Sequence, residues 1–159
     1  MELATRRVHF AGLTANPEEG WMLQVARNVT VVEEGFLRGK KYVLMDRDGK
    51  FSDAFRATLR QAGVEAVRLP PRSPNLNPHL ESFMGSIKAE CLDRMIFFGE
   101  KTLQSATTSF LEHYHVQRNH QGLANGLIAP GEVAGRTTGT VACRERLGGL
   151  LRYCYREAA

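Results

Sequence analysis

The chain has 159 residues, of which 43% are hydrophobic and 24% are charged, which is the size and composition of one globular domain. Its net charge of +4 allows nucleic-acid binding without establishing it. No apolar run is long enough to cross a membrane, and the start lacks the apolar segment of a secretory signal. We therefore expect no membrane partner and a cytoplasmic location.

The three cysteines are odd in number and lack the CxxC spacing of a metal or redox motif. We predict that Cys91, Cys143 and Cys154 are free thiols in a reducing compartment rather than a disulfide framework. The chain shows no internal repeat.

The first predicted elements are a strand and a helix. A turn at residues 4–6 leads into a strand at residues 7–13. Asn16 is placed to cap a helix whose first residue is Pro17. Apolar side chains at spacings of three and four residues continue this helix to a point before Gly35.

The next elements continue an alternating α/β order. Residues 42–45 form a short apolar strand whose C-terminal end delivers Asp46, which is where α/β sheets place ligand groups. Ser52 or Asp53 caps the following helix, which a glycine ends. Residues 64–69 form another short strand.

A proline-rich loop separates this region from two further helices. Its prolines lack backbone donors, which makes the loop unsuited to a helix or a strand. The next helix starts at Pro78 and carries Glu81 in its first turn, and a longer helix spans residues 102–115. From Gly131 onward the chain is rich in glycine, threonine and arginine, and residues 132–159 are predicted to form a tail with one short helix.

Asp46 and Glu81 are acidic residues at the ends of two different elements. Carboxylates brought together from separate elements can hold Mg²⁺, which binds through one or two carboxylates plus substrate phosphates. Two such ions about 4 Å apart can activate one oxygen and stabilise the departing one in phosphoryl transfer. The pattern therefore indicates the chemistry of cutting and joining DNA.

Two segments carry a family resemblance. One runs from MDRDGKF at residues 45–51 to HLESFMGSIKAE at residues 79–90, and the other is FLEHYHVQRNHQGLANGLIAP at residues 110–130. Together they resemble the catalytic core of the DDE integrase and transposase superfamily. In this resemblance Asp46 matches the second acidic residue of the family and Glu81 matches the third.

The resemblance covers residues 1–131 and implies an α/β fold of the ribonuclease H-like type, with a mixed sheet flanked by helices. It also implies a two-metal site for Mg²⁺ or Mn²⁺. The implied partner is DNA, both mobile-element ends and target, and the implied parent protein is a homo-oligomer associated with the bacterial nucleoid. Residues 132–159 lie outside the resemblance.

One family residue has no counterpart here. The first aspartate of the family lies in the first strand, and no acidic residue near the N-terminus occupies the matching position. We therefore expect a core that lacks its first strand, an incomplete metal site and an inactive isolated chain, so enzyme status stays open. Two alternatives remain: a non-catalytic remnant that binds DNA or a partner, and a ribonuclease H-like nuclease that acts on RNA.

Three basic residues are candidate DNA contacts. Lys88 lies seven residues after Glu81, so the two share a helix face. A DNA phosphate can meet this lysine while the reacting bond meets the metal. Arg68 and Arg72 flank the proline-rich loop and either touch DNA phosphates or are solvated loop charges.

Neighbouring polar residues have plainer interpretations. Asp48 could approach the same metal as Asp46, but a turn at Asp48 is the simpler interpretation. His115 and His120 are predicted to pack around the loop after the last helix rather than to bind zinc. The family resemblance assigns Arg118 to bracing the helix that carries the glutamate.

Overall fold

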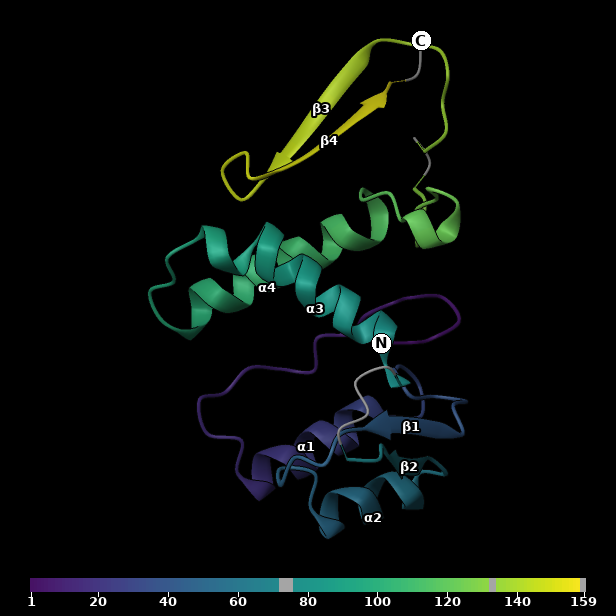
Figure 1. Cartoon of the computed structure of the whole chain (residues 1–159), viewed down its shortest axis with the longest axis vertical. Coiled ribbons are helices and arrows are strands. Elements are labelled where there is room, and N and C mark those ends of the chain that lie inside the picture. The colour runs from purple at the N-terminus through teal and green to yellow at the C-terminus, as the bar shows by residue number, and fades with distance from the viewer. Residues whose placement is uncertain (72–75, 132–133, 158–159) are drawn as a thin grey trace. The chain divides into compact units, whose positions relative to one another are not determined.

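The computed structural model, drawn in Figure 1, describes residues 1–71, 76–131 and 134–157. The chain divides into two compact units. We call Ala11–Pro78 the parallel-sheet unit, and Met1–Phe10 together with His79–Ala159 the hairpin unit. Each unit is described by itself.

The parallel-sheet unit is built from two strands and two helices (Figure 1). Strands β1 (Tyr42–Met45) and β2 (Glu65–Arg68) pair in parallel, with Tyr42 opposite Glu65 and Met45 opposite Arg68. Parallel strands need a crossover connection, and helix α2 (Asp53–Gln61) supplies it. Helix α1 (Glu19–Val29) precedes the pair. These four elements confirm the predicted order of helix, strand, helix and strand.

The core of this unit lies between one face of the strand pair and both helices. Its buried residues come from α1, β1, α2 and the residue before β2: Met22, Ala26, Val29, Met45, Phe55, Leu59 and Val64. Side chains alternate along a strand, so Met45 is buried while Tyr42 is 62% exposed and Leu44 is 37% exposed. The opposite sheet face of the unit is therefore apolar and largely uncovered within the unit.

The two helices of this unit begin differently. The Ser52 hydroxyl accepts a hydrogen bond from the Phe55 amide at 3.2 Å, which confirms the predicted cap of α2. The predicted cap of α1 is wrong, because the helix begins at Glu19 with Glu18 at the N-cap position and no side-chain cap bond. Asn16 lies in a preceding turn instead, where its carbonyl accepts from the Glu18 amide at 2.8 Å.

The hairpin unit contains two longer helices and a β-hairpin. Helix α3 (Pro78–Glu90) and helix α4 (Glu100–Val116) are joined through a short 3-10 turn, η2 (Leu92–Arg94). A second 3-10 turn, η3 (Gln121–Leu123), follows α4. Strands β3 (Val141–Arg146) and β4 (Leu151–Arg156) then pair in antiparallel fashion. The predicted starts and faces of the two helices are confirmed within a few residues.

An aromatic cluster forms the core of this unit. The buried residues are Phe83, Ile87, Cys91, Ala106, Phe110, Leu111, Tyr114 and Leu151. The Phe83 and Tyr114 rings meet edge to face with centroids 5.0 Å apart, an arrangement that adds about 1 kcal/mol to the burial of their area. Leu151 comes from β4, so the hairpin contributes to the same core as α3 and α4. The predicted boundary between a catalytic core ending at residue 131 and a tail starting at residue 132 stays a prediction.

The C-terminal segment departs from its prediction. It forms the β3–β4 hairpin rather than a tail with a short helix, because Leu147, Gly148 and Gly149 take positive φ angles that reverse the chain. The register places Cys143 directly opposite Cys154, and the two form a disulfide. The prediction that both are free thiols is therefore wrong, whereas Cys91 is free and buried.

The N-terminal segment also differs. The predicted turn is present, since the Glu2 amide donates to the Arg7 carbonyl at 2.8 Å. Residues 7–13 do not form the predicted strand. The Val8 amide instead donates to the imidazole of His115 at 2.9 Å, which ties Val8 to α4.

The α/β class is confirmed, but the expected mixed sheet is not formed by the described residues. They form two separate two-stranded sheets, one parallel and one antiparallel. Without a strand at residues 7–13 there is no antiparallel neighbour for β1 in that segment. Within the residues that the structure describes, no helix is long and apolar enough to cross a membrane.

Candidate functional site

Asp46 lies immediately after β1, at the C-terminal end of the parallel pair. The Leu69 amide donates to the Met45 carbonyl at 2.9 Å, which extends the pairing to the residue before Asp46. Arg47, the residue after Asp46, donates from Nε to the Leu69 carbonyl at 3.0 Å. The backbone that carries Asp46 is therefore tied to the end of β2, while the Asp46 side chain is exposed.

Asp48 forms a turn after Asp46. Its Oδ1 accepts from the Lys50 amide at 3.0 Å, and its Oδ2 accepts from Lys50 Nζ at 2.6 Å. These bonds to Lys50 lower the pKa of the Asp48 carboxyl. The Asp48 amide in turn donates to Asp46 Oδ1 at 3.1 Å. The predicted turn is confirmed, and Asp48 orients Asp46 through its amide while its own carboxylate binds Lys50.

Glu81 lies in the first turn of α3 and is exposed. A carboxylate is favourable there because the positive end of the helix dipole is near. Lys88 is also exposed, two helical turns further along, so the two side chains project from the same face. Gly85 lies between them, and a Cβ added there would have open space around it. This face of α3 is therefore free of contacts that would bury it within the hairpin unit.

Arg118 confirms the predicted brace of α3. Its guanidinium donates to Glu90 through Nη2 to Oε1 at 2.7 Å and through Nε to Oε2 at 3.0 Å. Glu90 lies nine residues after Glu81, about half a turn away around the helix. Arg118 therefore holds α3 from the side opposite Glu81. The pairing with Glu90 raises the pKa of Arg118, which stays fully charged.

The sequence reasoning missed Glu90 as the partner of this arginine. The only signal was that Glu90 is an acidic residue on the face of α3 that turns away from Glu81. Nothing in the local sequence joins it to Arg118, because the two residues belong to different elements.

The histidines of α4 and the following loop have structural partners. His120 Nε2 donates to the Tyr114 carbonyl at 2.8 Å, and His115 Nε2 accepts from the Val8 amide. His113 Nδ1 lies 3.2 Å from Gln117 Oε1. Burial lowers the pKa of all three imidazoles. The predicted packing of His115 and His120 around the loop is confirmed.

The other predicted site residues are distributed over both units. Asp46 and Arg68 belong to the parallel-sheet unit, and Glu81 and Lys88 belong to the hairpin unit. Arg68 is exposed at the end of β2, where its Cα pairs with Met45. Arg72 lies outside the described residues.

The donor chemistry of the candidate metal ligands suits a hard cation. Asp46 and Glu81 offer carboxylate oxygens, which Mg²⁺ and Mn²⁺ prefer over nitrogen and sulfur. Among residues 1–71, 76–131 and 134–157, no three His, Cys, Asp or Glu side chains come together in a group that could hold a metal ion.

Comparison with known proteins shows what part of the chain is similar to. Residues 62–126 match the family described as the integrase core domain, a segment that includes Glu81, Lys88 and Arg118. This match confirms the resemblance drawn from the sequence. Such a domain implies a ribonuclease H-like fold, a role with DNA and a requirement for divalent metal.

A curated relative points in the same direction. The chain is 31% identical over 83 residues to the "Insertion element IS476 uncharacterized 39.2 kDa protein" of Xanthomonas euvesicatoria. The alignment covers 52% of this chain and 23% of that protein, so the chain spans about a quarter of its relative. No solved structure matches the chain significantly. Part of the chain is thus similar to integrase core domains, and part is similar to an insertion-element protein.

Proposed function

We propose that the chain is part of the catalytic core of a DNA integrase or transposase, from a parent protein that cleaves DNA and transfers strands with a divalent metal. The observation that carries the proposal is the exposed Glu81–Lys88 face of α3. This face lies inside the matched segment, and Arg118 holds the helix from the other side. A carboxylate and an ammonium on one face suit a metal and a DNA phosphate, respectively.

Asp46 and Glu81 are the proposed metal ligands and catalytic residues. When bound, Mg²⁺ or Mn²⁺ would stabilise the negative charge that develops on the phosphate oxygens. The turn at Asp48 holds Asp46 with one carboxylate oxygen bonded to an amide, which leaves its other oxygen available to a cation. A further carboxylate is needed to complete the family's site, so we propose that these 159 residues alone do not cleave DNA.

Lys88, Arg68 and Arg72 are the proposed DNA contacts. Lys88 and Arg68 are exposed, and neither forms an ion pair with a carboxylate among the described residues. Basic side chains of this kind contact phosphates and position a duplex without reading its sequence. We further propose that the parent protein acts as a homo-oligomer on mobile-element ends and target DNA in the bacterial nucleoid.

The metal proposal is tested by Mn²⁺ titration of the whole chain, followed by electron paramagnetic resonance of the free ion. Asp46→Asn and Glu81→Gln should each weaken binding. The matched controls Asp93→Asn and Glu100→Gln remove exposed acids of the same kind, the second from the first turn of α4. Equal binding by all four variants would remove Asp46 and Glu81 from the proposed site.

The catalytic proposal needs the full-length insertion-element protein. There, Glu81→Gln should lower cleavage of a labelled element-end duplex by at least the ~100-fold that loss of an outer-shell partner can cause, while Glu100→Gln should not. An RNA–DNA hybrid is a second substrate in the same assay. Preference for the hybrid would replace the proposal with an RNA-directed nuclease of the same fold.

A non-catalytic DNA-binding role is the second candidate. It is favoured by the lack of a three-ligand acidic group among the described residues. In that case the 159-residue chain binds duplex DNA in the presence of a chelator and never cleaves it. Cleavage by this chain in Mn²⁺ would contradict the candidate.

A further inference from the structure

The segment near the C-terminus is rich in arginine. Residues 134–157 contain five arginines and two glutamates, a net charge of +3, whereas the whole chain carries +4. The five arginines are Arg136, Arg144, Arg146, Arg152 and Arg156. The hairpin and the segment before it therefore carry an excess of positive charge.

Two of these arginines have acidic partners. Arg146 Nη1 donates to Glu112 Oε2 at 2.6 Å, and Arg152 Nε lies 3.8 Å from Glu145 Oε1. The other three form no ion pair with a carboxylate among the described residues. Their charge is therefore available to an external anion.

Two tyrosines lie beside the unpaired arginines. Tyr153 and Tyr155 project from the same face of β4, with ring centroids 5.7 Å apart and planes 16° apart. The guanidinium carbon of Arg144 lies 5.9 Å from the centroid of the Tyr155 ring. Both tyrosines are only partly buried, so the two stacked rings form a partly exposed aromatic platform with a cation over Tyr155.

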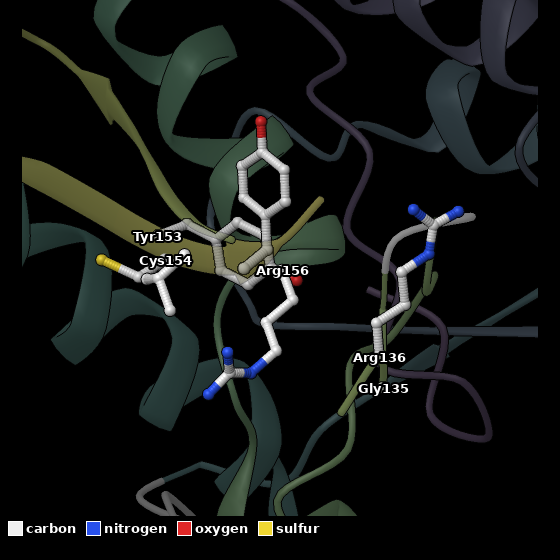
Figure 2. Close-up of a pocket in the computed structure, with 7 residues that line it drawn as sticks. Gly135, Arg136, Tyr153, Cys154 and Arg156 are labelled. Atoms are coloured by element: carbon white, nitrogen blue, oxygen red, sulfur yellow. The ribbon is translucent and has the colours of Figure 1, made fainter. Parts of the chain in front are cut away.

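A hollow of about 260 Å³ runs beside this platform and is lined by Gly135, Arg136, Val141, Tyr153, Cys154, Tyr155 and Arg156. Figure 2 shows Arg136 on one side of the hollow, and Tyr153 and Arg156 on the other. Arg156 Nη1 is held by the Gly139 carbonyl at 2.8 Å. Two cations therefore border a space whose wall includes both tyrosines.

The other end of the hairpin is fixed to the core of its unit. Leu151 is 5% exposed and belongs to the aromatic cluster. Arg146 binds Glu112 and also donates to Gln117 at 3.0 Å, both through side chains at the end of α4. The Cys143–Cys154 disulfide joins the two strands. The platform is therefore held on a supported ribbon and does not depend on a ligand to form.

We propose that this tyrosine–arginine surface, defined as Arg136, Arg144, Tyr153, Tyr155 and Arg156, binds single-stranded DNA. Exposed aromatic rings accept unpaired bases by stacking, while neighbouring cations follow the phosphates. Bases in a duplex are already stacked and paired, so the rings favour the single strand. The inference rests on the proposed function only in taking DNA as the partner, and it involves neither Asp46 nor Glu81.

The test titrates the whole chain into a labelled oligo(dT) and follows its fluorescence anisotropy, with a chelator present. The oligonucleotide has about 12 nucleotides, which is within the usual site sizes for such surfaces. Tyr153→Ala and Tyr155→Ala should each weaken binding about tenfold, the loss expected for one base–aromatic stack. Tyr155→Phe should keep most of the affinity because it keeps the ring. Tyr42→Ala, which removes an exposed tyrosine from β1, should change nothing.

The contribution of charge is tested inside the same hairpin. Arg144→Gln should weaken binding and reduce the slope of log K against log salt by about 0.7, the value for one single-strand phosphate contact. Arg152→Gln removes the same charge from an ion-paired residue and should have the smaller effect. Circular dichroism of each variant establishes that the hairpin unit is folded.

Three results would overturn the inference: equal affinity of the wild-type chain for oligo(dT) and its duplex, unchanged binding in both folded tyrosine-to-alanine variants, or equal effects of Arg144→Gln and Arg152→Gln. Because no metal is present, failure of Mn²⁺ binding at Asp46 and Glu81 leaves this measurement untouched. Conversely, loss of oligo(dT) binding leaves the metal titration unaffected, so the two proposals fail separately.

Discussion

The two candidate metal ligands are held in different ways in the two units. The position of Asp46 depends on contacts within its own unit: it follows a four-residue strand, the next residue is hydrogen-bonded to Leu69, and Asp48 forms a turn after it. Glu81 stands on a 13-residue helix that packs on an aromatic cluster. Arg118 reaches that helix from beyond the end of α4. The difference teaches that the position of Asp46 is set by a strand pair and a local turn, whereas that of Glu81 depends on the packing of the hairpin unit.

The largest expected effect comes from the core beneath Glu81. Phe110 is fully buried, and Phe110→Ala should lower the free energy of unfolding by about 3–5 kcal/mol. Hydrogen exchange should accelerate in α3 and α4 and leave α2 unchanged, as measured by mass spectrometry. Leu59→Ala is the matched control in the parallel-sheet unit. Acceleration in the same helices by both variants would contradict the separation of the two regions.

A pH effect should come next, because several groups contribute together. All five histidines of the chain lie in the hairpin unit. Burial lowers the pKa of four of them in the folded state: His9, His113, His115 and His120. Below the unfolded pKa of about 6.5, the unfolded state binds these protons first, so stability should fall as pH drops from there towards the folded pKa values.

Denaturation series from about one pH unit above to about one and a half below the ordinary histidine pKa of about 6.5 would check this expectation. Hydrogen exchange at the same pH values would locate the loss of stability. The loss should be confined to the hairpin unit, because the parallel-sheet unit contains no histidine. An equal loss in α1 and α2 would show that the histidines are not its cause.

Removal of the brace should have a smaller effect. Arg118→Ala leaves Glu90 without its partner and should cost about 1 kcal/mol, since both side chains are partly exposed to water. Arg118→Lys keeps the charge but loses the paired donors, so it should restore only part of the loss. Urea denaturation measures both variants. Full stability of Arg118→Ala would mean that packing alone positions α3.

The cap of α2 should contribute about as much as the brace or slightly less. Ser52→Ala removes the bond to the Phe55 amide and should cost about 0.5–1 kcal/mol. The effect should appear in the parallel-sheet unit, in contrast to Arg118→Ala. Ser82→Ala, an exposed serine in α3, is the control for loss of a hydroxyl. A larger loss for the control would contradict the capping role.

The local elements of the parallel-sheet unit could be predicted from the sequence. The apolar run at β1 and the serine at the start of α2 act through nearest neighbours, and both predictions are confirmed. The position of Asp46 at the end of β1 follows from the same local pattern. The cap of α1 could not be predicted, because Asn16 is used by the turn before the helix.

The C-terminal hairpin shows the limit of such reasoning. Its strands are short and rich in arginine, so their composition is ambiguous between an irregular tail and a β-ribbon. The register decides that Cys143 lies opposite Cys154, and a register cannot be derived from cysteine spacing alone.

By itself, the sequence determined helices α1 to α4 within a few residues, the two strands of the parallel-sheet unit, the place of Asp46 at the end of β1 and the integrase core resemblance. These features depend on short-range periodicity and on the identity of single residues. Only the tertiary structure decided that Glu90 is the partner of Arg118, that Val8 is hydrogen-bonded to His115, that the two cysteines form a disulfide, and that the tyrosine–arginine surface exists. Each of these joins residues from different elements, and such contacts depend on packing and pairing that no local pattern specifies.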